Sequence, residues 1–228
     1  MLDQKKIKQF WDDRAKTYDS LAFESIANLE EDPENLRIKI KLETDKVFNW
    51  IGDIHGLRIL DLGAGVGQWA FRFIDHGAKS VKAVEYSADL AMIGTREAKA
   101  RGINNLDFIV SPAEEFVSSE TFDIIFISGL FVYMNDDQAD KLMLNIKRLF
   151  TPDTFIILRD GTGINNRHEI NNKLSEHLKT VYSAIYRTRQ EYINIFNRNG
   201  TKNANKAKIN LPYLILKNTI IAVNKIAI

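Results

Sequence analysis

The sequence of 228 residues predicts an α/β fold, a doubly wound sheet of mostly parallel strands with helices on both faces. Two observations support this prediction. Short apolar runs rich in Val and Ile alternate along the chain with segments whose apolar residues lie three or four positions apart. The intervals between the apolar runs are also long enough for the crossover helices that parallel strands need. The length fits one domain with a full hydrophobic core.

Strands and helices are expected to alternate through the middle of the chain. Strands are expected at residues 57–62, 80–85, 106–110, 122–128 and 154–159. Helices, one of them a brief turn, are expected at residues 67–77, 88–101, 113–117 and 136–150. We therefore expect residues 57–160 to form the ligand-binding core of the fold.

The two ends of the chain show other patterns. Before the core, amphipathic helices are expected at residues 4–23 and 34–50, which makes 1–50 a helical segment. After the core, helices are expected at residues 165–180 and 188–197, followed by a closing pair of strands at 206–209 and 217–223. Residues 161–228 are expected to complete the same single domain rather than to form a second one.

Composition excludes several classes of protein. The balance of 31 Lys and Arg against 30 Asp and Glu disfavours nucleic acid as a partner, because phosphate contacts usually require a basic excess. The absence of Cys excludes disulfides, thiolate metal sites and thiol nucleophiles, and it fits a reducing compartment. Since no cluster of His, Asp and Glu has the spacing of metal ligands, no metal is expected.

No targeting segment is expected either. The first residues carry charges every few positions where a secretory signal would have an apolar run. No apolar run approaches the roughly 20 residues needed to cross a bilayer. We therefore expect a cytoplasmic protein without a membrane partner, and the sequence indicates no particular oligomeric state.

The sharpest motif is a strand that runs into a glycine-rich turn, Asp61-Leu62-Gly63-Ala64-Gly65-Val66-Gly67. Glycines let a ligand approach the backbone closely, and the helix that follows adds oriented N–H groups. A dinucleotide-binding fold would place a third glycine where Gln68 stands. The Asp61 carboxylate would repel a pyrophosphate but would help to hold a ligand with an ammonium and a sulfonium. For the motif taken alone, a plain strand-to-helix turn stays open as the alternative.

A second motif is the acidic residue Glu85 at the end of the second expected strand. It follows Gly63 by about 20 positions, where nucleoside-binding α/β folds place the carboxylate that binds the ribose hydroxyls. An exposed Glu at a strand end is the alternative interpretation. Beside the glycine turn, Glu85 favours a ligand of the adenosine type without a 2′-phosphate.

Together these segments resemble the class I S-adenosylmethionine-dependent methyltransferases. The resemblance extends from Phe10 to the end of the chain and rests on five motifs in the family's order: ILDLGAGVGQWA, VEYS, FIVSPAEEF, FDIIFISGLFVYM and NIKRLFTPDTFIILRD. It implies a seven-stranded, mostly parallel sheet with a C-terminal antiparallel strand, and residues 1–50 as a helical lid. It also implies S-adenosylmethionine as the cofactor.

The resemblance implies a set of cofactor-binding residues. Asp61, the glycine turn and Ser128 would face the methionine end, Glu85 the ribose, and Tyr86 one face of the adenine. The sequence has Pro112 where the family often carries an acidic residue, so the adenine contact would fall to Ala113 and Glu114. In the lid, Arg14 would pair with the methionine carboxylate and Tyr18 would cover the sulfonium. The implied set is Arg14, Tyr18, Asp61, Gly63, Ala64, Gly65, Gly67, Glu85, Tyr86, Ala113, Glu114 and Ser128.

The acceptor of the methyl group is expected beyond the fourth and fifth strands, because ligands of such sheets lie outside the carboxyl ends of the strands. His168 is the preferred catalytic base, and Asp160 is the other candidate. Trp11, which shares a helical face with Arg14 and Tyr18, is one of the residues expected to bind the acceptor. The acceptor-binding candidates are Trp11, Tyr133, Arg159, Arg167 and Tyr182.

Missing features narrow the function further. A chain without Cys cannot methylate carbon 5 of pyrimidines through a thiol nucleophile, and Ser128-Gly129-Leu130-Phe131 stands where adenine N-methyltransferases carry an Asn/Asp-Pro-Pro-Tyr/Phe motif. The same segment lacks the paired glutamates of arginine methyltransferases. The expected function is O- or N-methylation of a polar small molecule or a saccharide. The alternatives are an NAD-dependent dehydrogenase or epimerase, which Asp61 and Gln68 disfavour, and a non-catalytic methyltransferase-like protein that binds a partner.

Overall fold

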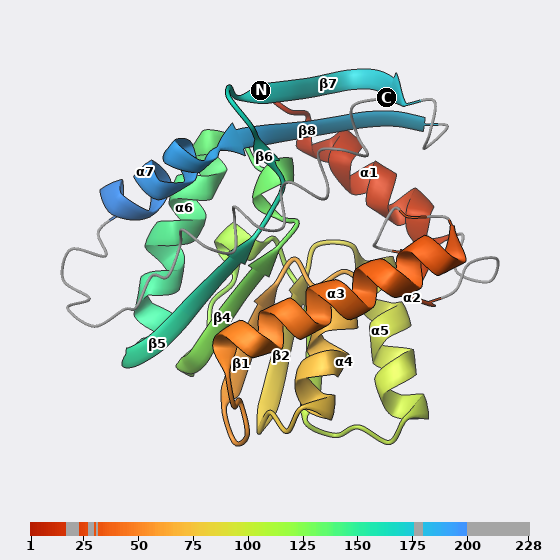
Figure 1. Cartoon of the computed structure of the whole chain (residues 1–228), viewed down its shortest axis with the longest axis vertical. Coiled ribbons are helices and arrows are strands. Elements are labelled where there is room, and N and C mark those ends of the chain that lie inside the picture. Colours follow the sequence, from red (N-terminus) through yellow and green to blue (C-terminus); the bar gives the residue numbers. More distant parts are fainter. Residues whose placement is uncertain (17–22, 27–29, 31, 176–179, 200–228) are drawn as a thin grey trace.

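The computed structural model describes residues 1–16, 23–26, 30, 32–175 and 180–199. In this part of the chain, a central parallel sheet lies between layers of helices, and a smaller sheet crosses one end (Figure 1). The expected closing strands at 206–209 and 217–223 lie outside the described residues. No helix within the described ranges has the length and apolar character needed to cross a membrane.

The central sheet confirms the predicted α/β class. Its strand order is β3-β2-β1-β4-β5, and every neighbouring pair is parallel. Because the chain moves outward from β1 in both directions, the order reverses between β1 and β4, which is where such sheets bind ligands. The described residues supply five of the seven strands that were expected: β1 (Arg58–Leu62), β2 (Ser80–Glu85), β3 (Leu106–Val110), β4 (Phe122–Ser128) and β5 (Phe150–Arg159).

Helices cover both faces of this sheet, so its central strands are apolar on both sides. One face packs against α3 and α4 through residues such as Val47, Phe73 and Phe126, and the other packs against α6 and α7. The helices are α1 (Gln4–Ala15), α2 (Phe23–Ile26), α3 (Pro33–Ile51), α4 (Gln68–Asp75), α5 (Ala88–Ala100), α6 (Asp136–Ile146) and α7 (Arg189–Arg198). Short 3₁₀ turns lie at Ala113–Glu115 (η2), Phe131–Tyr133 (η3) and Lys147–Leu149 (η4).

The prediction of a helix at residues 165–180 is wrong. This segment holds β7 (His168–Ser175), which pairs antiparallel with β8 (Thr180–Thr188). With β6 (Thr162–Gly163), the two strands form a three-stranded sheet of order β6-β8-β7. The cause is tertiary: β7 is the exposed edge strand of this sheet and carries no apolar face that a sequence pattern could reveal. The helix expected at 188–197 is confirmed as α7.

Candidate functional site

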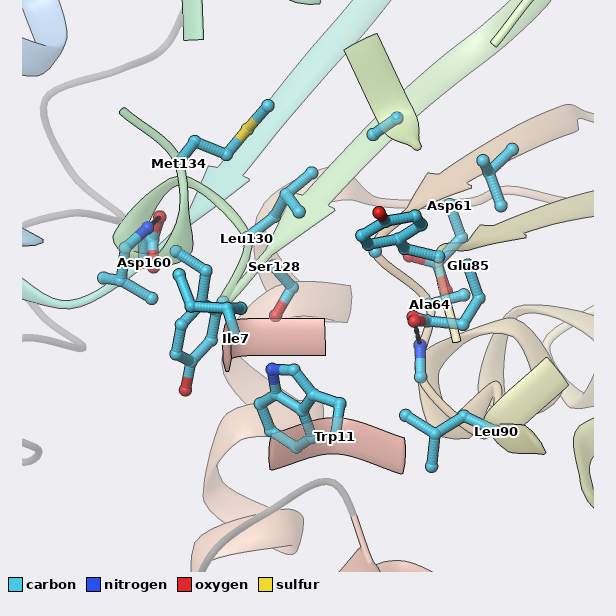
Figure 2. A pocket seen from close by; sticks show the side chains of 18 of the residues that line it. Ile7, Trp11, Asp61, Ala64, Glu85, Leu90, Ser128, Leu130, Met134 and Asp160 are labelled. Carbon is cyan, nitrogen blue, oxygen red and sulfur yellow. Dashed lines mark hydrogen bonds between the residues drawn. The ribbon is translucent and has the colours of Figure 1, made fainter. Parts of the chain in front are cut away.

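A cavity of about 510 Å³ opens at the carboxyl ends of β1, β2, β4 and β5, on both sides of the point where the strand order reverses. Figure 2 shows Asp61 and Glu85 at one side of this cavity and Asp160 at the other, with Trp11 and Ser128 between them. The cavity therefore has two ends, one on the glycine turn and one beyond β4 and β5.

The glycine turn forms the floor of the first end. The N–H groups of Gly63 and Ala64 both donate to the carbonyl of Val84, at 2.9 and 3.0 Å, which fixes the turn against β2. Gly63 has a φ of 74°, and a Cβ there would meet the Leu130 side chain at 3.0 Å. A glycine is needed here because φ lies in the left-handed region and the Leu130 side chain packs directly against the backbone. Its absent side chain leaves the turn open to the cavity.

Gly67 is required for helix packing, whereas the other glycines of the turn line the cavity. It begins α4 with a φ of 86°, and a Cβ there would lie 2.4 Å from the Phe108 ring. Gly67 does not line the cavity. Its lack of a side chain therefore serves the packing of α4 against β3, not contact with a ligand.

The carboxylate of Glu85 connects the end of β2 to the glycine turn. One oxygen accepts from the N–H of Gly65 at 2.7 Å and the other from the N–H of Ser87 at 2.8 Å. Burial raises the pKa of Glu85 above its ordinary value, and these backbone donors oppose the shift. The backbone N–H of Tyr86 also acts on this carboxylate, and a carboxylate has about four lone pairs, so Glu85 can still accept a hydrogen bond from the cavity.

Asp61 carries a buried oxygen without a hydrogen-bond partner. Its residue is 2% exposed, and Oδ2 has no donor within reach. Burial, reinforced by the nearby Glu85, raises the pKa of Asp61 to about 7. Native proteins rarely leave such an atom unpaired, so an orphan acceptor in a cavity wall indicates that a ligand supplies the donor.

A second buried carboxylate, Asp160, stands at the far end of the cavity. Its oxygens accept from the N–H groups of Val132 and Gly161 at 3.1 and 3.0 Å. Burial raises the pKa of Asp160 to about 7. The carboxyl group is therefore poised to exchange a proton near neutral pH, which is the range that suits a general base.

Aromatic side chains surround Asp160. The hydroxyl of Tyr182 lies 3.1 Å from that of Tyr133 and 3.2 Å from that of Tyr186. The Trp11 ring meets the Tyr133 ring edge-on, with centroids 5.4 Å apart. Trp11, Tyr133 and Tyr186 line the cavity, whereas Tyr182 does not. The second end of the cavity is thus a chamber of aromatic rings around one carboxylate.

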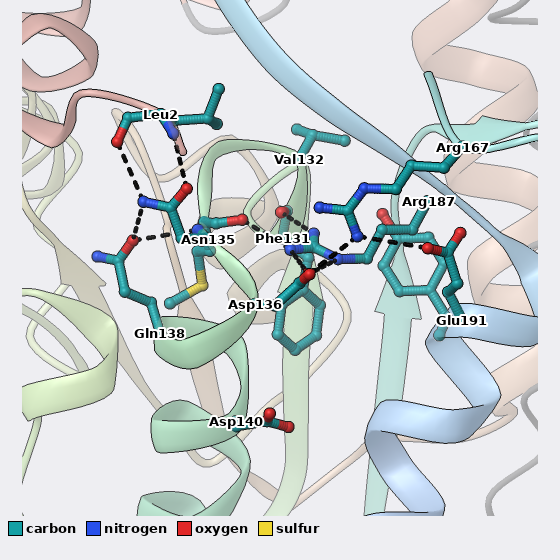
Figure 3. Close-up of polar contacts among 12 residues, drawn as sticks. Leu2, Phe131, Val132, Asn135, Asp136, Gln138, Asp140, Arg167, Arg187 and Glu191 are labelled. Atoms are coloured by element: carbon teal, nitrogen blue, oxygen red, sulfur yellow. Dashed lines mark hydrogen bonds and ion pairs between the residues drawn. The ribbon is translucent and has the colours of Figure 1, made fainter. Parts of the chain in front are cut away.

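Helix α1 forms a wall of the cavity through Gln4, Ile7 and Trp11. Before it begins, the backbone N–H of Leu2 donates to the Asn135 side chain at 2.7 Å, and that side chain donates back to the Leu2 carbonyl at 3.0 Å (Figure 3). Further along α1, the Ser87 hydroxyl donates to Asp12 at 2.6 Å. These contacts connect the helix to segments on opposite sides of the cavity.

The structure brings most of the candidate residues to one cavity. Those that line it are Trp11, Asp61, Gly63, Ala64, Gly65, Glu85, Tyr86, Ala113, Glu114, Ser128, Tyr133, Arg159 and Asp160. Candidates with described positions that do not line it are Arg14, Gly67, Arg167, His168 and Tyr182. Tyr18 lies outside the described residues.

Three of the candidates that do not line the cavity contact other parts of the protein. Arg14 donates to the carbonyls of Ser25 and Ile26 at the end of α2. His168 is exposed on β7, where its ring stacks against Tyr186 with centroids 6.3 Å apart. Arg167 pairs with carboxylates that include Asp136, Glu169 and Glu191. Among the described residues, no group of His, Asp and Glu could hold a metal ion.

The sequence did not reveal the contribution of α3. Lys39 and Glu43 line the cavity beside Arg159, and Glu43 forms an ion pair with Arg159 at 2.5 Å. Lys and Glu four positions apart on a helix are typical of a solvated face. Only the packing of α3 over the sheet brings them to the cavity, so no local pattern could have identified them.

The strand order, the glycine turn, the acidic residue that ends β2 and the cavity at the strand reversal are features that nucleoside-binding α/β folds share. Residues 59–153 match the family model described as a methyltransferase domain. This segment runs from β1 into β5 and contains the glycine turn, Glu85 and Ser128. This part of the chain therefore matches a methyltransferase domain, a family whose cofactor is S-adenosylmethionine.

Two curated relatives have longer chains. The sequence is 26% identical over 168 residues to phosphoethanolamine N-methyltransferase 1 of Triticum aestivum, covering 70% of this chain and 31% of that one. It is 26% identical over 171 residues to malonyl-[acyl-carrier protein] O-methyltransferase 2 of Ilyobacter polytropus, covering 71% of this chain and 60% of that one. The chain thus spans between about a third and three fifths of these relatives.

Solved structures share the fold. Phosphoethanolamine N-methyltransferase 1 of Haemonchus contortus, in complex with phosphoethanolamine and S-adenosylhomocysteine, gives a TM-score of 0.67 at 18% identity. That similarity covers 84% of this chain and 39% of the other. The complex of DhpI with S-adenosylhomocysteine gives 0.62 at 17% identity and covers 86% and 87% of the two chains. At these identities the similarity establishes the fold alone.

Proposed function

We propose that this protein transfers a methyl group from S-adenosylmethionine to an oxygen or nitrogen atom of a polar small molecule or saccharide. The observation that carries the proposal is the cavity wall where Asp61 and Glu85 meet the glycine turn. An ammonium would donate to the unpaired oxygen of Asp61, and a ribose hydroxyl would donate to the Glu85 carboxylate. The residues present therefore fit the cofactor of the family.

Each part of the cavity has a separate task in this proposal. Bound S-adenosylmethionine supplies a methyl group activated by a sulfonium. The backbone of Gly63 and Gly65 admits the ligand, Glu85 holds the ribose, and Ala113 and Glu114 flank the adenine. Methyl transfer is an in-line displacement, so the main work of these residues is to hold donor and acceptor in alignment.

At the acceptor end we assign the base to Asp160. It lines the cavity and its pKa is about 7, whereas His168 is exposed and lies outside the cavity wall. The ionised Asp160 carboxylate accepts a proton from the attacking group. Trp11, Tyr133 and Tyr186 line this end of the cavity, and aromatic rings can attract a cation. A carboxylate among aromatic rings favours an amine as the methylated group, and the two phosphoethanolamine N-methyltransferases are relatives with a substrate of that kind.

We also propose that helix α1 is a lid. Gln4, Ile7 and Trp11 close the cavity from one side, and hydrogen bonds of Leu2, Gln4 and Asp12 hold the two ends of this segment across it. Opening of the lid would admit both ligands, and closure would exclude water from the chamber around Asp160. The contacts between Leu2 and Asn135 and between Asp12 and Ser87 would then form on closure.

Glu85→Ala is expected to weaken the binding of S-adenosylhomocysteine by about 1–3 kcal/mol, because the ribose hydroxyls lose their acceptor. Titration calorimetry measures the change. Binding of 5′-methylthioadenosine, which has the same ribose but no amino-acid end, should weaken equally. Asp107→Ala, which alters an exposed carboxylate on β3 away from the cavity, is the control. Unchanged affinity in Glu85→Ala would remove the ribose assignment.

Asp160→Asn is expected to lower turnover at saturating cofactor by about 10²–10⁴-fold, because an amide cannot accept the proton. The rate of the wild-type protein should rise as the pH passes through 7, since the base works in its ionised form. The variant should lose this rise and keep its affinity for S-adenosylhomocysteine. Full turnover with an unchanged pH profile would show that Asp160 is not the base.

Transfer of labelled methyl from S-adenosylmethionine to a cell extract tests the proposed function. After incubation, the extract is separated into small molecules, proteins and nucleic acids. Label is expected in the small-molecule fraction, and the Asp160→Asn protein serves as the matched control. Label confined to protein or nucleic acid would contradict the proposed acceptor class. An absence of transfer would favour the non-catalytic alternative.

A further inference from the structure

The ends of β1, β4 and β5 present three polar side chains to the same face of the sheet. Asp61 is paired with Phe126 in the register of β1 and β4, and Ser128 is paired with Arg159 in that of β4 and β5. Paired residues project to the same face, as do residues two apart on one strand such as Phe126 and Ser128. Asp61, Ser128 and Arg159 therefore share the face that α3 and α4 cover.

The Arg159 side chain extends from β5 across β4 toward β1. Nη1 donates to the Ser128 hydroxyl at 2.8 Å, and Nη2 pairs with the Glu43 carboxylate at 2.5 Å. The group also lies over the Trp69 ring, 5.7 Å from its centroid. Since β5 is separated from β1 only by β4, these contacts bring the guanidinium to the neighbourhood of Asp61. Arg72 interacts electrostatically with both Asp61 and Arg159, which supports their proximity.

Two buried atoms of this region lack hydrogen-bond partners, and they have opposite character. Asp61 Oδ2 is an acceptor without a donor, and Arg159 Nε is a donor without an acceptor. Both residues line the cavity. A ligand that satisfied both would need an ammonium and a carboxylate close together, which is the arrangement at the end of an α-amino acid.

We infer that Arg159 binds the carboxylate of the donor's amino-acid end through Nε, while Asp61 accepts from its ammonium. This inference rests on the proposed function, since the donor is S-adenosylmethionine. It moves Arg159 from the acceptor end to the donor end of the cavity. Glu43 and Ser128 position the guanidinium for this contact.

The assignment has a consequence for the acceptor. Among the described residues that line the cavity, only Lys39 and Arg159 are basic. Lys39 belongs to α3, on the same side as Glu43. With Arg159 committed to the donor, no basic side chain among the described residues lines the chamber around Asp160, and the charge of Arg187, which acts on Asp160 from behind the wall, is already paired with Asp136. Such a chamber suits a cationic or neutral acceptor group better than an anionic one.

Calorimetry with S-adenosylmethionine and with decarboxylated S-adenosylmethionine tests the inference without any acceptor. The two ligands share the adenosine, the sulfonium and the amine, and they differ in the carboxylate. Arg159→Met is expected to weaken S-adenosylmethionine binding by about tenfold to a hundredfold, which is typical for loss of a charge-assisted hydrogen bond. The binding of the decarboxylated ligand should be unchanged. Arg58→Met is the matched control, because Arg58 pairs with Asp123 at the opposite end of the sheet.

The outcomes separate the inference from the proposed function. If the wild-type protein binds neither ligand, the proposed function fails. If it binds both ligands equally, or if Arg159→Met leaves S-adenosylmethionine binding unchanged, only the inference is overturned. Equal weakening of the two ligands by Arg159→Met would also overturn it, because the arginine would then support the cavity without contacting the carboxylate.

Discussion

Arg187→Met is expected to lower the free energy of unfolding by about 2–5 kcal/mol, because two buried carbonyls lose a charged donor and Asp136 loses a buried partner. Arg187 lies on β8 and is 0% exposed. It donates to the carbonyl of Phe131 at 2.6 Å and to that of Met134 at 2.8 Å, and it forms an ion pair with Asp136 (Figure 3). Methionine fills much of the volume but provides no donor. The Met134 oxygen would then stay buried without its guanidinium donor, and the Phe131 oxygen would keep only the N–H of Met134, at 3.1 Å.

Arg167→Met is the matched control for this prediction. Arg167 also pairs with Asp136, at 3.0 Å, but its side chain is 27% exposed and solvent can replace the contact. Loss of such a pair costs about 0–1 kcal/mol. Urea unfolding of the two variants measures the difference. Similar losses of unfolding free energy in the two variants would contradict the claim that the buried hydrogen bonds of Arg187 stabilise the fold.

The same variant should also affect catalysis. The turn that Arg187 holds, η3, contributes Val132 and Tyr133 to the chamber around Asp160. Loosening this turn is expected to lower turnover of Arg187→Met more than it lowers the affinity for S-adenosylhomocysteine. Arg187 would thus act as a positioning residue for the acceptor end, since it does not line the cavity.

Asp61→Asn is expected to stabilise the protein at neutral pH and to weaken its binding of the cofactor. The pKa of Asp61 is raised from 3.8 to about 7 by burial and by Glu85. Between these values the unfolded chain loses a proton that the folded protein keeps, so wild-type stability falls as the pH rises from about 4 to about 7. An amide does not ionise and avoids this loss, which amounts to at most about 4 kcal/mol.

Urea unfolding across this pH range measures the effect. The stability difference between Asp61→Asn and the wild type should grow from pH 4 to pH 7 and stay constant above it. Asp123→Asn is the control. The ion pair with Arg58 lowers the pKa of Asp123 below 3.8, so this variant should be less stable than the wild type by an amount that stays nearly constant across the range. If Asp61→Asn is less stable than the wild type at pH 8, the raised pKa of the buried Asp61 carboxyl is contradicted.

The sequence predicted the residues at the glycine-turn end of the cavity better than those around Asp160. Asp61, the glycine turn and Glu85 follow strands whose apolar runs are buried on both sides, so their place at the sheet edge follows from local pattern. The hairpin of β7 and β8 was missed because β7 is an exposed edge strand held by pairing rather than by its own apolar face.

The contacts of the charged residues also could not be predicted from local sequence pattern. Arg14 was expected at the cofactor, but its guanidinium contacts the end of α2. Glu43 has the appearance of a surface residue in the sequence and lies in the cavity beside Arg159. These positions depend on how α1, α2 and α3 cross the sheet, and helix periodicity does not specify a crossing.

The central claim is that the cavity binds S-adenosylmethionine. Titration calorimetry of the full chain with S-adenosylhomocysteine tests it most directly, with NAD as the comparison ligand. We expect one molecule of S-adenosylhomocysteine to bind per chain and no binding of NAD, because Asp61 would repel a pyrophosphate and suits an ammonium, while Glu85 suits a ribose diol. A folded protein that binds NAD, or that does not bind S-adenosylhomocysteine, would contradict the claim.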